Sequence, residues 1–214
     1  MKLSEAVRGV SGTLAADGEF SCIAFATEQE QSQFLTFLEK EKFLPALDNS
    51  KISCVLTTSA LAEKIPPHIK GVFLCDRPKA ALFEIHNRLA RHPDYVGASA
   101  ATVVGEGCSI SPLAAIDREN VVIGDRVTIE PFVVIKGRVI IGNDVTIRSG
   151  AVIGCKGFSF SKDTQGQNVS VEDTARIIIE DHVEIFEQVA ISTGIFPWEE
   201  TRIGENTKVD AQCF

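Results

Sequence analysis

Aliphatic residues recur at every sixth position through the second half of this chain, and no other feature restricts its fold as strongly. Most are followed four residues later by a second small or β-branched side chain, such as Val127 or Val145. A sandwich of short strands would instead show spacings of roughly 8–12 residues. The pattern predicts a solenoid in which each hexad supplies one strand and one turn, and three hexads close a triangular coil. The repeated positions are Val104, Ile110, Ile116, Ile123, Ile129, Ile135, Ile141, Ile147, Ile153, Ile179, Ile185, Ile191, Ile203 and Val209.

Turn-forming residues follow the aliphatic positions where such a coil must bend, as in Gly124-Asp125 and Gly142-Asn143-Asp144. The repeat is interrupted twice, from Gly154 to Arg176 and from Ser192 to Arg202. Solenoids accept insertions as loops on one face, which is often the binding face. We therefore expect both interruptions to be loops that leave the solenoid.

Residues 1–95 lack the six-residue period and have the pattern of an α/β domain. Apolar runs of strand length occupy residues 51–56 and 71–75, and a helical pattern follows each of them. The clearer helix is expected from Pro78 to Arg91, with Leu82, Ile85 and Leu89 on one face. Residues 92–95 are expected to link this domain to a second one that comprises residues 96–214.

Charge and composition exclude several classes of partner. With 29 acidic and 21 basic residues the net charge is −8, which disfavours binding to nucleic acid or to an anionic membrane. The sequence contains no long apolar stretch of the kind that forms a signal peptide or a transmembrane segment, so we expect a cytoplasmic protein. The cysteines have no metal-binding spacing, which predicts buried free thiols and no metal site; they are Cys22, Cys54, Cys75, Cys108, Cys155 and Cys213.

Three short motifs occur in this two-domain frame. The first is Leu35-Thr36-Phe37 with Phe43 six residues after Phe37, and the second is the run from Ser149 to Phe160. The third is the run Lys208-Val209-Asp210-Ala211-Gln212-Cys213. Together they resemble the UDP-3-O-acylglucosamine N-acyltransferase family of lipid A biosynthesis, over nearly the whole chain. The resemblance implies an α/β uridine-binding domain followed by a left-handed parallel β-helix of hexapeptide repeats.

The first motif implies a site for the uracil ring. In the family two aromatic residues sandwich this ring, and Phe37 and Phe43 match their positions. Stacking on a nucleobase contributes about 1–3 kcal/mol in proteins that bind single strands. Lys40 joins the expected substrate-binding residues, although Lys40-Glu41 replaces the family's Asn-Pro. From the residues alone, the alternative is that both phenylalanines belong to the core.

The second motif implies the exit of a loop from the β-helix. Phe158 and Phe160 are expected there among the substrate-binding residues, at a surface where a neighbouring subunit packs. The alternative is that these rings hold the loop to its own helix.

The third motif implies catalytic residues. Asp210 matches the family's supporting acid, and the catalytic histidine is expected seven positions later, beyond Phe214. His68, His86, His92 and His182 do not match that position, and we expect His182 on an outward turn. We therefore expect an incomplete β-helix, from a truncated or paralogous family member, and no activity of this chain alone.

The implied reaction moves a hydroxyacyl group from acyl carrier protein to the amine of a UDP-3-O-acylglucosamine. Phosphopantetheine on the carrier would present the acyl group, and no tightly bound cofactor is expected. A homotrimer is implied. Two alternatives stay open, a UDP-sugar-binding module without catalysis and an acyltransferase for another UDP-linked amino sugar. Carbonic anhydrases of this repeat class use three histidine ligands for zinc, and the repeat domain offers only His182.

Overall fold

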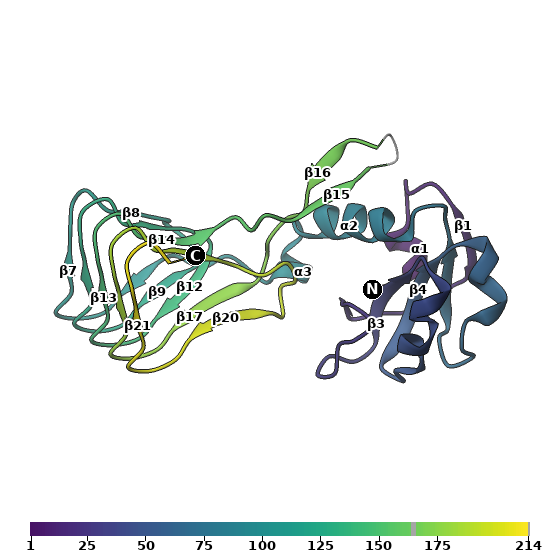
Figure 1. The fold of residues 1–214 in the computed structure, drawn as a ribbon, viewed down its shortest axis with the longest axis horizontal. Helices are drawn as coiled ribbons and strands as arrows, with labels where there is room; N and C mark the ends of the chain where they lie inside the picture. The colour runs from purple at the N-terminus through teal and green to yellow at the C-terminus, as the bar shows by residue number, and fades with distance from the viewer. Residues whose placement is uncertain (164–165, 214) are drawn as a thin grey trace. The chain divides into compact units, whose positions relative to one another are not determined.

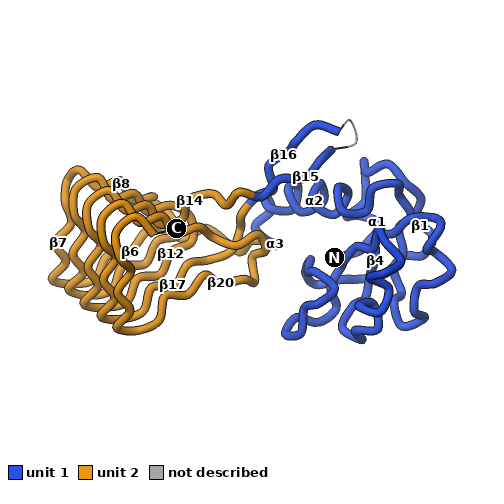
Figure 2. The backbone as a smooth tube through the Cα atoms, in the orientation of Figure 1, with its two compact units in different colours: residues 1–95, 159–172 blue, residues 96–158, 173–214 orange. Residues whose placement is uncertain are grey.

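The computed structural model describes residues 1–163 and 166–213, and it divides the chain into two compact units (Figures 1 and 2). Unit 1 contains residues 1–95 and 159–172, and unit 2 contains residues 96–158 and 173–214. The first change of unit falls between Tyr95 and Val96. Residues 96–214 are expected from the sequence to form one domain, but the segment Ser159–Glu172 within this range belongs to unit 1.

Unit 1 is built on a mixed sheet whose strands lie in the order β1-β5-β4-β3-β2. Strands β5, β4, β3 and β2 run parallel, and β1 is antiparallel to β5. The runs predicted as strands form β4 and β5, which confirms the α/β pattern. The bounds are β1 Thr13–Ala16, β2 Cys22–Ile23, β3 Phe34–Leu38, β4 Ile52–Thr57 and β5 Gly71–Leu74.

The helix predicted to start at Pro78 is α2, Pro78–Leu89, and it buries Leu82 and Ile85. After β4 the chain forms a 3₁₀ helix rather than an α-helix, and the expected linker is the short helix α3. The other helices are also short, so the sheet and α2 form most of this core. Their bounds are α1 Leu3–Ala6, η1 Glu41–Asp48, η2 Ser59–Lys64 and α3 Pro93–Val96.

The first interruption of the repeat returns to unit 1 as a β-hairpin. Strands β15, Phe160–Lys162, and β16, Asn168–Ser170, pair antiparallel. The side chain of Asn87 on α2 donates to the Ser170 carbonyl oxygen at 2.9 Å and accepts from the Glu172 N–H at 2.8 Å. These bonds satisfy backbone groups at the end of the hairpin, and they explain why the segment belongs to unit 1.

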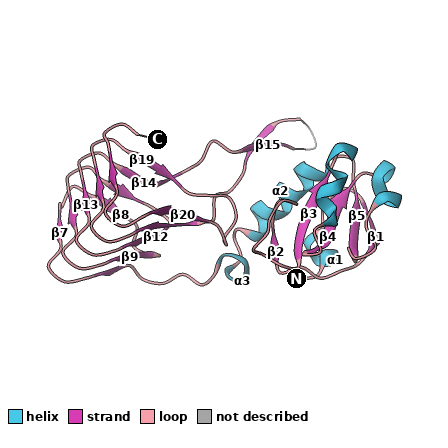
Figure 3. Ribbon diagram, turned by 60° about the horizontal axis from the view of Figure 1, so that its bottom comes forward, coloured by secondary structure: helices cyan, strands magenta, loops and turns pink. Residues whose placement is uncertain are grey.

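Unit 2 is a parallel β-helix, as the hexad pattern predicted (Figure 3). In the described residues its faces are the parallel sheets β21-β18-β13-β10-β7, β19-β14-β11-β8 and β20-β17-β12-β9-β6. Ile129 pairs with Ile147, three hexads later, so each strand lies over its equivalent in the next coil. The bounds are β6 Val103–Val104, β7 Ser109–Ile110, β8 Ala115–Ile116, β9 Val121–Ile123, β10 Thr128–Ile129, β11 Val134–Ile135, β12 Arg138–Ile141, β13 Thr146–Ile147, β14 Val152–Cys155, β17 Arg176–Ile179, β18 Glu184–Ile185, β19 Ala190–Ser192, β20 Glu200–Ile203 and β21 Lys208–Val209.

The repeated aliphatic side chains fill the interior of this β-helix. Those from Ile123 to Ile185 are buried in one continuous cluster, while Val104 at the first coil is 47% exposed. The second interruption is a loop in which the ring of Trp198 stacks on the buried Phe196 at 5.9 Å. His182 is exposed on a turn with a φ of 59°, as expected for an outward position.

Candidate functional site

An aromatic cavity of about 320 Å³ opens in unit 1 beside the end of β3. Phe37 on β3 and Phe43 on η1 line it, and Phe25 contributes a third ring. The Phe25 and Phe37 rings meet edge to face with centroids 6.5 Å apart. Such a cavity, with aromatic walls and a few polar groups, suits a flat heterocycle.

The sequence predicted Phe37, Lys40 and Phe43 as one site, and the structure brings all three to this cavity. Phe43 is 55% exposed and Phe37 is partly buried. The alternative that both are core residues is therefore wrong for Phe43. An exposed aromatic ring in the wall of a cavity can stack on a ligand.

Charged groups surround the aromatic walls. Glu39, Lys40 and Lys79 line the cavity, and the Nζ of Lys42 lies 4.8 Å from the centroid of the Phe43 ring. The Glu39 carboxylate accepts a hydrogen bond from the Lys79 backbone N–H at 3.0 Å. This bond joins the end of β3 to the first turn of α2, and it brings Lys79 to a cavity that lies forty residues earlier in the sequence.

Sequence reasoning did not identify Phe25, Glu39 or Lys79 as site residues. The sequence marks Pro78 as the start of a helix, and helix starts in parallel α/β units lie near the ends of strands. That rule would have placed Lys79 near Glu39. No local pattern around Phe25 indicated its role.

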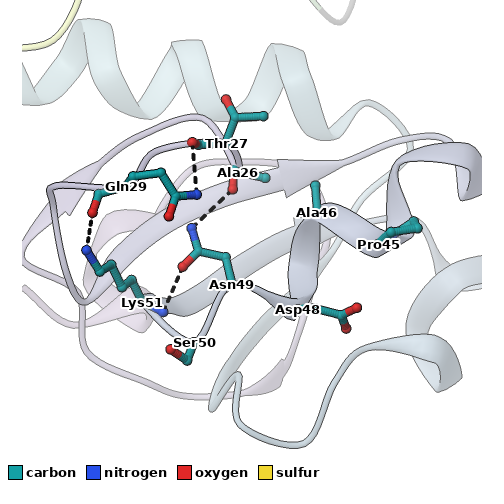
Figure 4. Close-up of a pocket in the computed structure, with 9 residues that line it drawn as sticks. All are labelled: Ala26, Thr27, Gln29, Pro45, Ala46, Asp48, Asn49, Ser50 and Lys51. Atoms are coloured by element: carbon teal, nitrogen blue, oxygen red, sulfur yellow. Dashed lines mark hydrogen bonds between the residues drawn. The ribbon is translucent and has the colours of Figure 1, made fainter.

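A second, more open hollow of about 480 Å³ adjoins the aromatic cavity, and the two share Ala26, Thr27 and Ala46 (Figure 4). Several of its polar groups form hydrogen bonds within the protein. The Asn49 amide donates to the carbonyl oxygens of Ala26 and Glu28, and its Oδ1 accepts from the Lys51 N–H. Asn49 therefore holds the loop that carries one wall of the aromatic cavity.

The two other predicted binding residues do not line the cavity. Phe158 belongs to unit 2 and is 96% exposed. Phe160 begins β15 in unit 1 and is 49% exposed. The expectation that they meet a neighbouring subunit stays a prediction.

Asp210 follows β21 in unit 2, where it is exposed. Its Oδ1 accepts a hydrogen bond from the Ala211 N–H at 2.8 Å. The carboxylate thus fixes the local turn. Its expected role as a supporting acid stays a prediction.

All six cysteines are free thiols, but only Cys54 and Cys75 are buried, so the prediction of burial is wrong for the others. Cys213, in the last described coil, is exposed. Burial raises the pKa of the Cys75 thiol to about 11, which keeps it protonated and unreactive at neutral pH. Residues 1–163 and 166–213 contain no group of three or more His, Cys, Asp or Glu that could hold a metal ion.

Comparison with known proteins identifies one family model and several relatives that share one name. The bacterial transferase hexapeptide model, of six repeats, matches residues 120–155. The UDP-3-O-acylglucosamine N-acyltransferase of Coxiella burnetii strain RSA 493 is 28% identical, over 97% of this chain and 67% of the relative. The enzyme of the same name from Helicobacter hepaticus is 30% identical, over 94% of this chain and 65% of the relative.

A third relative of that name, from Rhizobium meliloti, is 41% identical over 33% of this chain. The chain thus spans about two thirds of the length of the Coxiella and Helicobacter relatives. These matches confirm the predicted relationship, and they confirm that the chain is of the acyltransferase class. No helix in the described part of the chain has both the length and the apolar character to cross a membrane.

Proposed function

The chain is a homologue of the UDP-3-O-acylglucosamine N-acyltransferases, and we propose that its aromatic cavity binds the uracil ring of a UDP-linked amino sugar. The observation that carries the proposal is the meeting of Phe37, Phe43 and Lys40 at one cavity. Phe37 and Phe43 are far enough apart in sequence to come from different elements, β3 and η1. Two rings from different elements that line one cavity can stack on both faces of a base.

The proposed reaction is transfer of a hydroxyacyl group to the amine of a UDP-3-O-acylglucosamine, a step of lipid A biosynthesis. Acyl carrier protein donates the group from its phosphopantetheine, and no other cofactor takes part. Asp210 supports a histidine base in this scheme, because a carboxylate can hold an imidazole in the tautomer that accepts a proton. The expectation that the chain alone is inactive stays a prediction.

The proposed architecture of unit 2 is a left-handed β-helix that assembles as a homotrimer. Its support is the hexapeptide match together with parallel sheets whose strands pair three hexads apart. The exposed Phe158 ring offers an apolar group for a neighbouring copy. Light scattering of the purified chain at micromolar concentration tests this, and a monodisperse monomer would contradict the trimer.

Two measurements test the proposed function. Isothermal calorimetry compares UDP with ADP, and we expect binding of UDP alone, weakened in Phe37→Ala. A transfer assay supplies UDP-3-O-acylglucosamine and hydroxyacyl-loaded carrier protein. Transfer supports the acyltransferase, while uridine binding without transfer supports a UDP-sugar-binding module. Failure of both UDP and UDP-3-O-acylglucosamine to bind would overturn the proposal.

A further inference from the structure

Three lysines, Lys40, Lys42 and Lys79, lie around the aromatic cavity of this acidic chain. Other basic residues, such as Arg126, Arg176 and Arg202, each pair with a carboxylate. Among the described residues, Lys40, Lys42 and Lys79 form no ion pair with a carboxylate. A group of cations at one cavity, in a chain of net charge −8, gives this part of the surface a positive charge that suits an anion.

The acidic residues next to these lysines are already engaged. Glu41 forms a salt bridge with Lys64 at 2.5 Å. One oxygen of Glu39 accepts from the Lys79 backbone N–H. Three charged side chains line the cavity, Lys40, Lys79 and Glu39, and together they give its wall a net charge of about +1. Lys42, beside Phe43, adds a further positive charge.

Two of the cations occur where the aromatic walls end. Lys40 lies between the strand that carries Phe37 and the helix that carries Phe43. Lys79 lies in the first turn of α2, and its Nζ is 6.0 Å from the centroid of the Phe83 ring. A base that stacks on the rings leaves its sugar and phosphates outside the stack, within reach of flexible ammonium groups at the edge.

We propose that Lys40 and Lys79 bind the diphosphate of a uridine nucleotide whose base lies between Phe37 and Phe43, and that they make the cavity selective for the diphosphate over the nucleoside. This inference rests on the proposed function, since it takes the base to be in the aromatic cavity. It adds Lys79 to the site and assigns the two lysines a task separate from stacking. Glu39, on the same wall, opposes the phosphate charge and limits the gain.

Calorimetry with uridine, UMP, UDP and inorganic pyrophosphate tests the proposal on the whole chain. At low salt we expect UDP to bind roughly tenfold tighter than uridine, with UMP between them. The advantage should shrink at about 0.5 M salt, because exposed charges are screened. Pyrophosphate alone should bind weakly, since it lacks the stacking contact.

Variants separate the phosphate contact from the fold. Lys79→Gln should lower UDP affinity about 3–10-fold and leave uridine affinity within about twofold, at an unchanged thermal midpoint. Lys79→Arg should retain most of the UDP affinity. Glu39→Gln should raise UDP affinity, because it removes a like charge and keeps an oxygen for the Lys79 N–H. Lys70→Gln is the matched control, since exposed Lys70 donates to the Pro67 carbonyl oxygen and lies outside the cavity.

The outcomes distinguish this inference from the proposed function. Uridine could bind, with an affinity that Phe37→Ala lowers, while UDP binds no tighter than uridine. The proposed diphosphate contact would then be wrong, and the proposed site for the uracil ring would be supported. Equal losses for uridine and UDP in Lys79→Gln would also overturn the contact, because Lys79 would then act on the shape of the cavity. If neither uridine nor UDP binds, the proposed function and this inference both fail.

Discussion

The hydroxyl of Tyr95 lies 3.0 Å from Nδ1 of His86, and this bond joins α2 to α3. The other ring nitrogen, Nε2, lies 2.8 Å from the carbonyl oxygen of Glu172. A carbonyl oxygen only accepts, so Nε2 carries a proton. In the neutral ring that burial favours, Nδ1 accepts from the Tyr95 hydroxyl. The fully buried His86 holds three segments of unit 1 together.

Acid should destabilise unit 1 through this histidine. Burial lowers the pKa of His86 below its ordinary value, while Glu172 opposes the shift. Above about pH 6.5 both folded and unfolded states are neutral, and below it the unfolded chain binds the proton more readily. The free energy of unfolding should therefore fall as pH drops below about 6.5. Urea denaturation followed by circular dichroism at several pH values measures this slope.

The matched controls are His86→Gln and His92→Gln, the latter at an exposed histidine. His86→Gln should remove the slope although it lowers stability at pH 7, and His92→Gln should leave the slope unchanged. The same slope in wild type and His86→Gln would show that other groups set the acid response.

Phe37→Ala should weaken uridine nucleotide binding by about 1–3 kcal/mol with little loss of stability, because the ring faces a cavity. Phe34→Ala, on the same strand, removes a fully buried ring and should cost about 3–5 kcal/mol of stability. Calorimetry and thermal unfolding of both variants give the comparison. A large drop in midpoint for Phe37→Ala without a change in affinity would assign Phe37 to the core.

Gly154→Ala should disturb the exit of the chain from the β-helix more than Gly137→Ala. Both glycines have a positive φ, 84° and 76°, so alanine at either costs about 1–2 kcal/mol of backbone strain. At Gly154 the added Cβ would also clash with the Lys136 carbonyl oxygen, whereas at Gly137 it meets nothing within 4 Å. We expect an additional loss of about 1–3 kcal/mol at Gly154. Equal stabilities in guanidinium titrations would refute the close approach.

Ile147→Ala should lower the stability of unit 2 by about 2–5 kcal/mol, because its side chain is fully buried between coils. Ile140→Ala is the control, since that side chain points outward and is 39% exposed, and we expect a loss below about 1 kcal/mol. Trp198, the single tryptophan, lies in unit 2 and reports its unfolding by fluorescence. Similar midpoints for the two variants would contradict the inward register.

The β-helix was predictable from the sequence because its energetics are local and repeated. Each inward Ile or Val meets its equivalent three hexads away, so the pattern that marks the strand also marks its neighbour, as for Ile129 and Ile147. Phe37 and Phe43 were predictable for a different reason. They are close in sequence, and their pairing was recognised as a motif.

The remaining features depend on contacts between distant residues. Nothing near Ser170 or Glu172 in the sequence indicates that Asn87 and His86 bind them, because those bonds form between side chains and backbone groups more than eighty residues apart. Lys79 reaches the cavity only through the junction of α2 with β3. The 3₁₀ geometry of η2 after β4 likewise depends on tertiary packing, which overrides weak helical preferences.

The hairpin of β15 and β16 makes unit 1 discontinuous, and this restricts how the chain can be divided. The polypeptide passes from one unit to the other at residues 95–96, 158–159 and 172–173. A single cut after Tyr95 would therefore separate α2 from β16, where the Ser170 carbonyl oxygen accepts from Asn87. Exchange of the N-terminal unit between relatives, by recombination or in engineered chimeras, requires that residues 1–95 and 159–172 be transferred together.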